Sequence, residues 1–461
     1  MRRQYKRAHS FRPGRRSRRQ VRTVTFTYQS DTMNAVDNYA IERGPKPSPL
    51  KFILPLILVV LSIFLRPAVG SIPVINIKDV KPEVTPMATP KPEPRDTTDT
   101  HWQENLRTVD GDRIYLAWDQ WRKEFKDIPP GINVISPHFF EVVTVGDKSE
   151  VKLYSETRSG WDDWTPESYV KTAHENGIKV WAMVQNMEDK ESEDVAAHIV
   201  TTEEGRNHFY TKMKEWVEAY DLDGICLDFE RMNPANKEAY TEFAAGLKAV
   251  LPEDCVVSAC ITVKLNGNNE DNWYQCYDRP ALAQAVDYLC IMAYDNHRNR
   301  TMEPVAGIPW VDKHVRRLLE EIPSNKLILG VPFYGTDYRE EVQEGDVFAT
   351  RPMWKDSGWT TTIFNLNSAL SNGKYTRGDS TFVVDYWIDK GSWNSEIGIS
   401  NYSFVDTDGI LHQIWIDDEN SLYQKGRLAL RYQLGGVAVW KLSLGTTPMW
   451  EALLKGITEG Q

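Results

Sequence analysis

The stretch Asp223-Gly224-Ile225-Cys226-Leu227-Asp228-Phe229-Glu230 decides the fold predicted for this chain. It begins with an Asp-Gly turn and continues as a short apolar run that ends in two carboxylates. Side chains two residues apart on a strand point to the same face. A strand here therefore directs Asp228 and Glu230 to one place, with Cys226 below them. Like charge and partial burial both raise a carboxyl pKa, so one of the two is expected to keep its proton near neutral pH, as a general acid must.

Short apolar runs of this kind recur from about residue 109, and polar stretches with helical spacing follow most of them. This alternation is typical of parallel strands joined by helices. Eight runs predict a closed (β/α)8 TIM barrel, and we find no glycine-rich phosphate loop after the first run to favour an open doubly wound sheet. The predicted strands are 113–118, 132–136, 178–185, 224–230, 256–262, 288–294, 327–333 and 436–442, and the predicted helices are 165–176, 203–220, 234–251, 279–285, 311–321 and 421–433.

One interval, between Tyr334 and Gln413, does not follow the repeat. Its sequence alternates and is rich in aromatic residues, and a structureless loop of this size is uncommon inside a compact domain. We expect residues 337–412, approximately, to form a small β-rich (α+β) subdomain inserted between strands seven and eight. Because the insertion follows a barrel strand, it is expected on the face that carries the carboxylates, as one wall of a cleft.

The sequence before the barrel predicts three regions: a basic cytoplasmic tail over residues 1–47, a membrane anchor over 48–75 and a Pro-rich linker over 76–108. The anchor rests on the uncharged, mostly apolar run 52–65, whose flanking Lys51 and Arg66 can extend their charges to the membrane surface. Basic residues before the run predict a single span with the barrel outside the cell membrane. Cleavage near Gly70, which would give a secreted protein, is the alternative.

The distribution of charge along the chain argues about which partners it can bind. The chain has a net charge of -11, but residues 1–70 hold 14 Lys and Arg against 3 Asp and Glu, so the remainder carries -22. Such an acidic region argues against nucleic-acid binding, which the basic tail alone would suggest.

The 5 cysteines lack zinc-site spacing and lie mostly in or beside predicted strands. Buried free thiols are the expectation, with one disulfide as the alternative.

Several polar and aromatic residues follow predicted strands, where barrel enzymes place their reacting groups. Asn186 follows strand three, Glu230 closes strand four, Tyr294 and Asp295 close strand six, and Trp440 lies on strand eight. Together they supply an acid, a second carboxylate, a phenol and a flat aromatic platform, a set that suits a sugar ring. Taken singly, each also has a structural interpretation, as a core aromatic or a paired carboxylate.

Four motifs together resemble glycoside hydrolase family 18, the chitinase-like hydrolases. The opening stretch is similar to the family's DGxDxDxE signature, and residues 291–295, 329–335 and 435–440 are similar to its motifs on strands six, seven and eight. The resemblance covers roughly residues 110–455. Residues 415–421 and 425–436 resemble the bacterial spore- and cell-wall-associated branch, related to the spore germination hydrolases. In that match the acidic run 417–419 starts a helix and does not form a metal site.

The resemblance implies substrate-assisted, retaining cleavage without a metal or organic cofactor. Glu230 would protonate the glycosidic oxygen, Asp228 would orient the 2-acetamido group that attacks the anomeric carbon, and Tyr294 would hydrogen-bond the acetamido oxygen. Cys226 departs from the pattern, since family members often carry Asp there and the spore-associated branch often Asn. A thiol is a poor acceptor, so an altered pH profile is expected. Substrate contacts are implied for Trp440, Asp295, Asn186, Met292 and Tyr334.

The function expected from the sequence is hydrolysis of a β-linked glycan containing N-acetylglucosamine. Peptidoglycan and chitin-type chains both remain open, as do endo and exo action, and a monomer is expected. The alternative is a non-catalytic, glycan-binding chitinase-like protein. Retention of Glu230 argues against that alternative.

Overall fold

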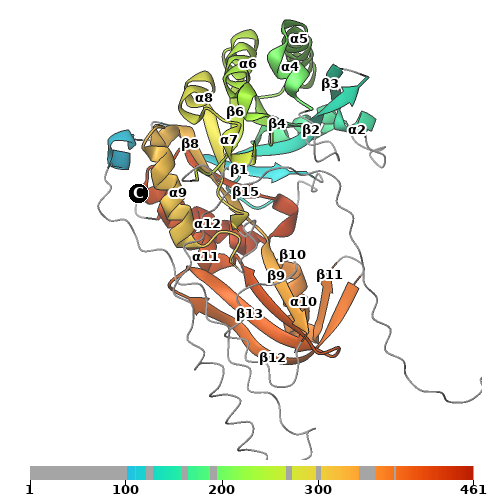
Figure 1. Cartoon of the computed structure of the whole chain (residues 1–461), viewed down its shortest axis with the longest axis vertical. Coiled ribbons are helices and arrows are strands. Elements are labelled where there is room, and N and C mark those ends of the chain that lie inside the picture. Colours follow the sequence, from blue (N-terminus) through green and yellow to red (C-terminus); the bar gives the residue numbers. More distant parts are fainter. Residues whose placement is uncertain are drawn as a thin grey trace, which may run out of the picture. The chain divides into compact units, whose positions relative to one another are not determined.

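The parallel barrel is the framework of the molecule (Figure 1). The computed structural model describes residues 101–108, 111–120, 128–146, 148–157, 165–186, 195–265, 272–296, 303–341, 359–377 and 380–459. Within these ranges eight parallel strands pair in order, and the first strand also pairs with the last, which closes the barrel. The strands are β1 (Ile114–Asp119), β2 (Val134–Val145), β4 (Lys179–Gln185), β5 (Gly224–Asp228), β6 (Val256–Thr262), β7 (Tyr288–Met292), β8 (Leu327–Pro332) and β15 (Gly436–Trp440).

The (β/α)8 prediction is confirmed, with two systematic differences in strand length. Every residue of β5 and of β8 is buried, as expected where helices cover a sheet of parallel strands. Four predicted strands were one or two residues too long at their C-terminal ends, because the chain leaves the ladder before Glu230, Tyr294, Phe333 and Lys441. The second predicted strand was too short, since β2 continues to Val145 and pairs with the antiparallel β3 (Lys148–Leu153).

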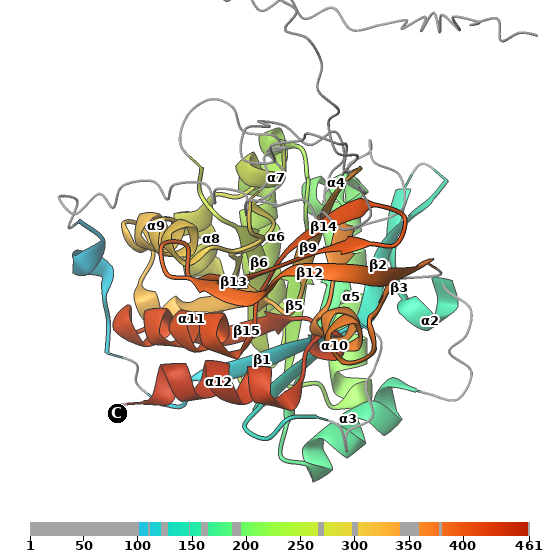
Figure 2. The same cartoon turned by 90° about the horizontal axis from the view of Figure 1, so that it is seen from below.

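Helices lie outside the strands (Figures 1 and 2). Several begin at a side chain that accepts a backbone N–H, as at Thr165, Thr202, Asp278 and Asp418. The six predicted helices are all present, with bounds shifted by up to three residues. They are α3 (Pro166–Glu175), α5 (Glu203–Tyr220), α6 (Lys237–Val250), α8 (Arg279–Ala285), α9 (Ile308–Leu319) and α11 (Glu419–Arg431), and the shorter helices include α2 (Tyr154–Thr157), α4 (Ala197–Thr201) and α7 (Asn272–Gln275).

The last helix, α12 (Thr447–Thr458), was not predicted. It runs beside α11, and the two helices meet at Gly426 and Gly456 (Figure 2). A Cβ added at Gly426 would lie 2.3 Å from the carbonyl oxygen of Leu453, so only glycine allows this close approach. The packing buries Trp450 and Ile457 against the barrel core.

A second sheet lies in the sequence between β8 and β15 (Figure 1). Among the described residues it has six strands in the order β10-β9-β14-β13-β12-β11, and every pairing is antiparallel. Its elements run from residue 335 to residue 416, against the 337–412 expected. They are β9 (Gly335–Glu341), β10 (Trp359–Thr361), α10 (Ile363–Asn372), β11 (Lys374–Arg377), β12 (Ser380–Asn394), β13 (Ile399–Asp406) and β14 (Ile410–Ile416).

The tail and the anchor expected over residues 1–47 and 48–75 lie outside the described residues, as does the linker up to residue 100. The described chain begins with a short 3-10 helix, η2 (His101–Asn105). None of the helices in the described ranges combines the length and the apolar content that a membrane crossing requires.

Candidate active site

The C-terminal ends of the barrel strands bring the predicted site residues to one end of the barrel. Asp228 ends β5, Met292 ends β7 and Trp440 ends β15. Asn186, Glu230, Tyr294 and Tyr334 each follow their strand by one or two residues. Parallel strands in a barrel share a direction, so these positions converge at one mouth.

Asp228 is the more buried of the two carboxylates, with 4% of its surface exposed. Its Oδ2 accepts a hydrogen bond of 2.7 Å from Nε2 of Gln185, the residue beside it on β4. Its Oδ1 is buried and has no hydrogen-bond partner among the described residues. Burial, with the nearby charge of Glu230, raises the pKa of Asp228 well above its usual value. The direction of this shift is the one that the sequence predicts for a carboxylate held beside a second one.

Glu230 is half-buried and is fixed through both its main chain and its side chain. Its backbone N–H donates to Oδ1 of Asn186 over 2.8 Å, and Nδ2 of Asn186 donates to its carbonyl oxygen over 2.9 Å. Its Oε2 accepts a hydrogen bond from Nε1 of Trp273. The amide of Asn186 thus holds the backbone that carries Glu230, and the predicted contact of Asn186 with substrate stays a prediction.

Trp273 and Gln185 are site residues that the sequence interpretation missed. Trp273 lies on α7, after β6, with 3% of its surface exposed. It is separated from Glu230 by 43 positions and belongs to none of the four motifs. The nearby Tyr277 also reaches this strand end, since its hydroxyl donates to the carbonyl oxygen of Phe229 over 2.8 Å.

Three of the predicted residues form a second group across the mouth. Tyr294 is 6% exposed, and burial raises the pKa of its phenol well above the usual value, so it is a neutral donor. Its ring meets the ring of Tyr334 edge-on, with centroids 6.3 Å apart. The Tyr334 hydroxyl donates to Oδ1 of Asp295 over 2.5 Å, which fixes that carboxylate. Met292 is 5% exposed below them.

The indole ring of Trp440 is partly exposed and packs on the buried indole ring of Trp118. Its centroid lies 6.0 Å from that of Trp118 on β1, at an interplanar angle of 61°. The next residue, Lys441, is mostly buried and donates to Oε1 of Gln120 over 2.5 Å. Burial lowers the pKa of Lys441 to about 8. A half-exposed indole at the mouth of the barrel suits the apolar face of a sugar ring.

Thiols occupy the barrel interior next to Asp228. Cys226, Cys260 and Cys290 come from the neighbouring strands β5, β6 and β7, and the sulfurs of Cys226 and Cys260 are 3.8 Å apart. Hydrogen bonding to Cys226 and burial raise the pKa of Cys260 well above its usual value. All five cysteines lie in the described part of the chain and are buried and free, which confirms the expectation of free thiols.

The other candidates have structural roles. Asp418 caps α11, so the prediction that residues 417–419 start a helix is confirmed. Of two histidines near the ends of predicted strands, His138 is buried and packs on the ring of Tyr154 at 4.2 Å, and His297 lies outside the described residues. Within the described ranges, no group of three or more His, Cys, Asp or Glu side chains is suited to hold a metal ion.

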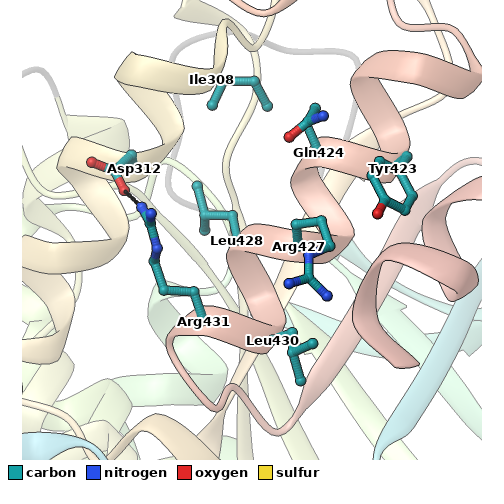
Figure 3. A pocket seen from close by; sticks show the side chains of 8 residues that line it. All are labelled: Ile308, Asp312, Tyr423, Gln424, Arg427, Leu428, Leu430 and Arg431. Atoms are coloured by element: carbon teal, nitrogen blue, oxygen red, sulfur yellow. Dashed lines mark ion pairs between the residues drawn. The ribbon is translucent and has the colours of Figure 1, made fainter. Parts of the chain in front are cut away.

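A hollow of about 470 Å³ also lies between α9 and α11, on the helices outside the barrel (Figure 3). Arg431 and Asp312 approach each other across it, with 4.0 Å between Nη1 and Oδ1. None of the predicted site residues lines it. Its lining residues are Ile308, Asp312, Tyr423, Gln424, Arg427, Leu428, Leu430 and Arg431.

Residues 115–445 match the sequence profile of the family described as "Glycosyl hydrolases family 18". The chain belongs to glycosyl hydrolase family 18. It is therefore a glycosidase, and the matched residues include the carboxylate pair at the end of β5.

Two known bacterial proteins are similar in sequence to this family 18 glycosidase. It is 25% identical over 297 residues to "Uncharacterized glycosylase YvbX" of Bacillus subtilis (strain 168), covering 63% of this chain and 78% of that one. It is 24% identical over 274 residues to the "Cortical fragment-lytic enzyme" of Bacillus anthracis, where the match spans 58% of this chain and 57% of the relative. The chain thus spans little more than half of that relative's length.

Solved structures agree with the fold. The crystal structure of a chitinase from Chromobacterium violaceum ATCC 12472 superposes with a TM-score of 0.60 at 19% identity, covering 76% of this chain and 100% of the chitinase. At this identity the likeness shows the barrel fold that the two proteins share.

Proposed function

We propose that this glycosidase cleaves a β-linked glycan containing N-acetylglucosamine, with the substrate's own acetamido group as the nucleophile. One observation carries the proposal: a buried Asp228 and a hydrogen-bonded Glu230 share the end of β5, at the same mouth of the barrel where the neutral phenol of Tyr294 follows β7. The two carboxylates lie in the signature motif of a family that is an exception to the usual two-carboxylate scheme. Neither carboxylate then needs to attack the sugar itself.

In the proposed reaction the carboxylate pair holds one proton. Glu230 gives this proton to the glycosidic oxygen as the bond to the anomeric carbon breaks. The acetamido carbonyl oxygen attacks that carbon and forms an oxazolinium ion, which the ionised Asp228 stabilises through the acetamido N–H. Glu230, now a carboxylate, takes a proton from the water that opens the ring, so the product keeps its configuration.

The remaining residues would bind the sugar in the productive pose. Tyr294 is neutral and can donate to the acetamido oxygen. Trp440 offers a flat face below the ring, backed by the buried Trp118. The Asp295 carboxylate, fixed by Tyr334, suits a sugar hydroxyl, and Met292 is an apolar neighbour of this group.

The substrate we favour is a bacterial cell-wall glycan. The names of several relatives describe lysis of cortical fragments, whereas the structural likeness to a chitinase shows only the fold. The predicted anchor over residues 48–75 would hold the barrel outside the cell membrane, where it can reach such a glycan. Cleavage near Gly70 would instead release it as a secreted enzyme.

The proposal is tested by substituting the acid. We expect Glu230→Gln to lower the release of reducing ends from purified peptidoglycan or N-acetylglucosamine oligomers by about 10²- to 10⁴-fold, because general acid catalysis typically contributes this much. Glu253→Gln is the matched control, since Glu253 is exposed in the connection between α6 and β6, before the strand and away from the C-terminal strand ends. If the wild type and Glu230→Gln bind the oligomers equally and neither cleaves them, the protein is a glycan-binding protein and the proposal is wrong.

A further inference from the structure

The indole of Trp273 contacts the acid directly. Its Nε1–H donates to Oε2 of Glu230, and the ring is 97% buried, so the bond is largely shielded from water. An indole N–H is a donor only and cannot accept a proton from the acid. The contact therefore favours negative charge on Oε2 and leaves the other oxygen, Oε1, to carry the proton.

The position of the indole is set by the protein itself. The hydroxyl of Thr262, at the end of β6, donates to the carbonyl oxygen of Trp273 over 3.1 Å. The buried guanidinium of Arg279 donates to the carbonyl oxygens of Val263 over 3.0 Å and Tyr274 over 2.8 Å, which ties α7 back to the strand. The indole is thus attached to the barrel wall through several bonds that need no ligand.

We propose that Trp273 is a positioning residue for the acid: its N–H assigns the two oxygens of Glu230 to different tasks, Oε2 to hold charge and Oε1 to deliver the proton. The inference rests on the proposed function, in which Glu230 protonates the leaving oxygen. A hydrogen bond to the carboxylate also makes the acid stronger, because it stabilises the form that remains after proton transfer.

Few groups titrate near this contact in the working pH range. Asp228 on β5 is the nearest, and it shares the proton of the pair. Burial raises the pKa values of Tyr277, ahead of α8, and Tyr294, after β7, well above their usual range, so both phenols stay neutral. Tyr240 on α6, which faces Asp228, is raised by burial in the same way. Hydrogen bonding from the Cys260 thiol lowers the pKa of Cys226, two residues before Asp228 on β5, well below its usual value, so this thiol is a further group near the pair. A change at Trp273 is read out first by the carboxylate pair, because the indole contacts Glu230 directly.

The test is Trp273→Phe, which keeps an aromatic ring and removes the N–H. The basic limb of the kcat profile reports loss of the proton from the acid. Without the donor, this limb is expected to move to higher pH by about one unit, since a hydrogen bond to a charged group is worth roughly that shift. Trp310→Phe makes the same chemical change on α9, where the indole packs on His314, and should leave the profile unchanged.

A second measurement needs no substrate. In protein labelled with ¹⁵N-tryptophan, the indole N–H resonance absent from Trp273→Phe identifies Trp273. This resonance should move with pH as the carboxylate pair titrates in the wild type, and the movement should be lost in Glu230→Gln. If Trp273→Phe does not fold, Trp273→Tyr, which also lacks the indole N–H, identifies the resonance instead.

The outcomes separate this inference from the proposed function. An inactive wild type whose Trp273 resonance still titrates with Glu230 contradicts the proposed function and supports the contact. An active wild type with an unmoved basic limb in Trp273→Phe, or a Trp273 resonance that ignores Glu230, overturns the inference. A lower rate with an unchanged pH profile also overturns it, because it indicates a packing role only.

Discussion

The thiol of Cys226 lies two residues before Asp228 on β5 and is one of the groups that affect its pKa, after burial, Glu230 and Gln185. It resides where the family pattern has a carboxylate or an amide, and it lies 3.8 Å from a second thiol, that of Cys260. A thiol is a weak donor, so it gives little stabilisation to a carboxylate above it. This matches the finding that Oδ1 of Asp228 has no hydrogen-bond partner among the described residues.

We predict that Cys226→Asn moves the acid limb of the kcat/KM profile to lower pH by about half a unit to one unit. Asn is close to Cys in volume and offers an N–H that favours ionised Asp228, and one pKa unit corresponds to about 1.4 kcal/mol, within the worth of such a bond. Rate profiles between pH 3 and 9 on an N-acetylglucosamine oligomer measure the shift. Cys255→Asn, at a buried cysteine before β6, is the control.

The same substitution has a consequence for stability. Folding raises the pKa of Asp228 above the value of about 3.9 that an Asp has in an unfolded chain. As the pH rises from the unfolded pKa toward the folded one, the unfolded chain gives up its proton first, so the free energy of unfolding falls. Cys226→Asn should therefore reduce the loss of unfolding free energy between pH 4 and pH 7. An unchanged acid limb together with unchanged pH dependence of unfolding would show that the thiol does not control Asp228.

Which site residues were predictable from sequence depends on where each one lies. Asp228, Glu230, Tyr294 and Trp440 belong to strand ends, and the barrel pattern alone brings strand ends together. Trp273 reaches Glu230 from a short helix in a connection, across 43 positions, and no local pattern indicates such a contact. Gln185 ends its strand as Asp228 does, but only the pairing of β4 with β5 shows that the two side chains meet.

At the scale of elements, a buried ion pair joins β14 to α11. Nζ of Lys425 bonds Oδ1 of Asp417, both side chains are fully buried, and the Ser421 hydroxyl donates to the same oxygen over 2.7 Å. Burial raises the pKa of Asp417 and lowers that of Lys425. Removing one partner leaves a buried charge without compensation, which is far more costly than removing both.

We predict that Lys425→Met destabilises the protein by about 3–5 kcal/mol near neutral pH, the usual cost of breaking a buried pair. The loss should shrink toward pH 4, because Asp417 can then take up a proton and become neutral. Urea unfolding followed by tryptophan fluorescence measures it. Lys455→Met on the exposed face of α12 should change the unfolding free energy by less than about 0.5 kcal/mol.

The double variant Asp417→Asn, Lys425→Met completes this comparison. With both charges removed, we expect most of the lost stability to return, since no ion is left buried. A double variant as unstable as Lys425→Met alone would show that packing, and not charge, accounts for the loss.

Elements were predictable where they repeat. The strand and helix alternation placed all eight barrel strands, because each buried run has its own apolar signal. The order of the second sheet was not predictable, since antiparallel strands of similar composition can pair in many ways. The sheet pairs β9 with β14 and places the short β11 at one edge. His412 on β14 contacts both Asp337 on β9 and Tyr375 on β11, residues that are distant in the sequence.

For the whole molecule, charge distinguishes the possible substrates. The chain carries -11 overall, and the 14 basic and 3 acidic residues before position 71 balance to +11, which leaves -22 on the remainder. Peptidoglycan carries carboxylates, whereas N-acetylglucosamine oligomers are neutral. An acidic enzyme is repelled by the former at low salt, and the repulsion is screened as the Debye length falls from about 30 Å at 0.01 M to about 8 Å at 0.15 M.

We predict that kcat/KM of the full chain on solubilised peptidoglycan fragments rises several-fold between about 0.01 M and 0.15 M salt. Over this range the Debye length becomes about threefold to fourfold shorter, so the repulsion between enzyme and substrate weakens. The value for neutral oligomers should stay constant, and that comparison is the control for general salt effects. A falling value on peptidoglycan would indicate a local basic patch that outweighs the overall charge.

The pairing of β1 with β15 joins residues 114–119 to residues 436–440. The ribosome makes the first of these strands long before the second. At roughly 5–20 residues per second, the first strand waits tens of seconds for its neighbour. During that time the growing sheet has two unpaired edges, which are templates for aggregation. The growing chain therefore exposes these edges until β15 is made, and a chain truncated before residue 436 would keep them exposed.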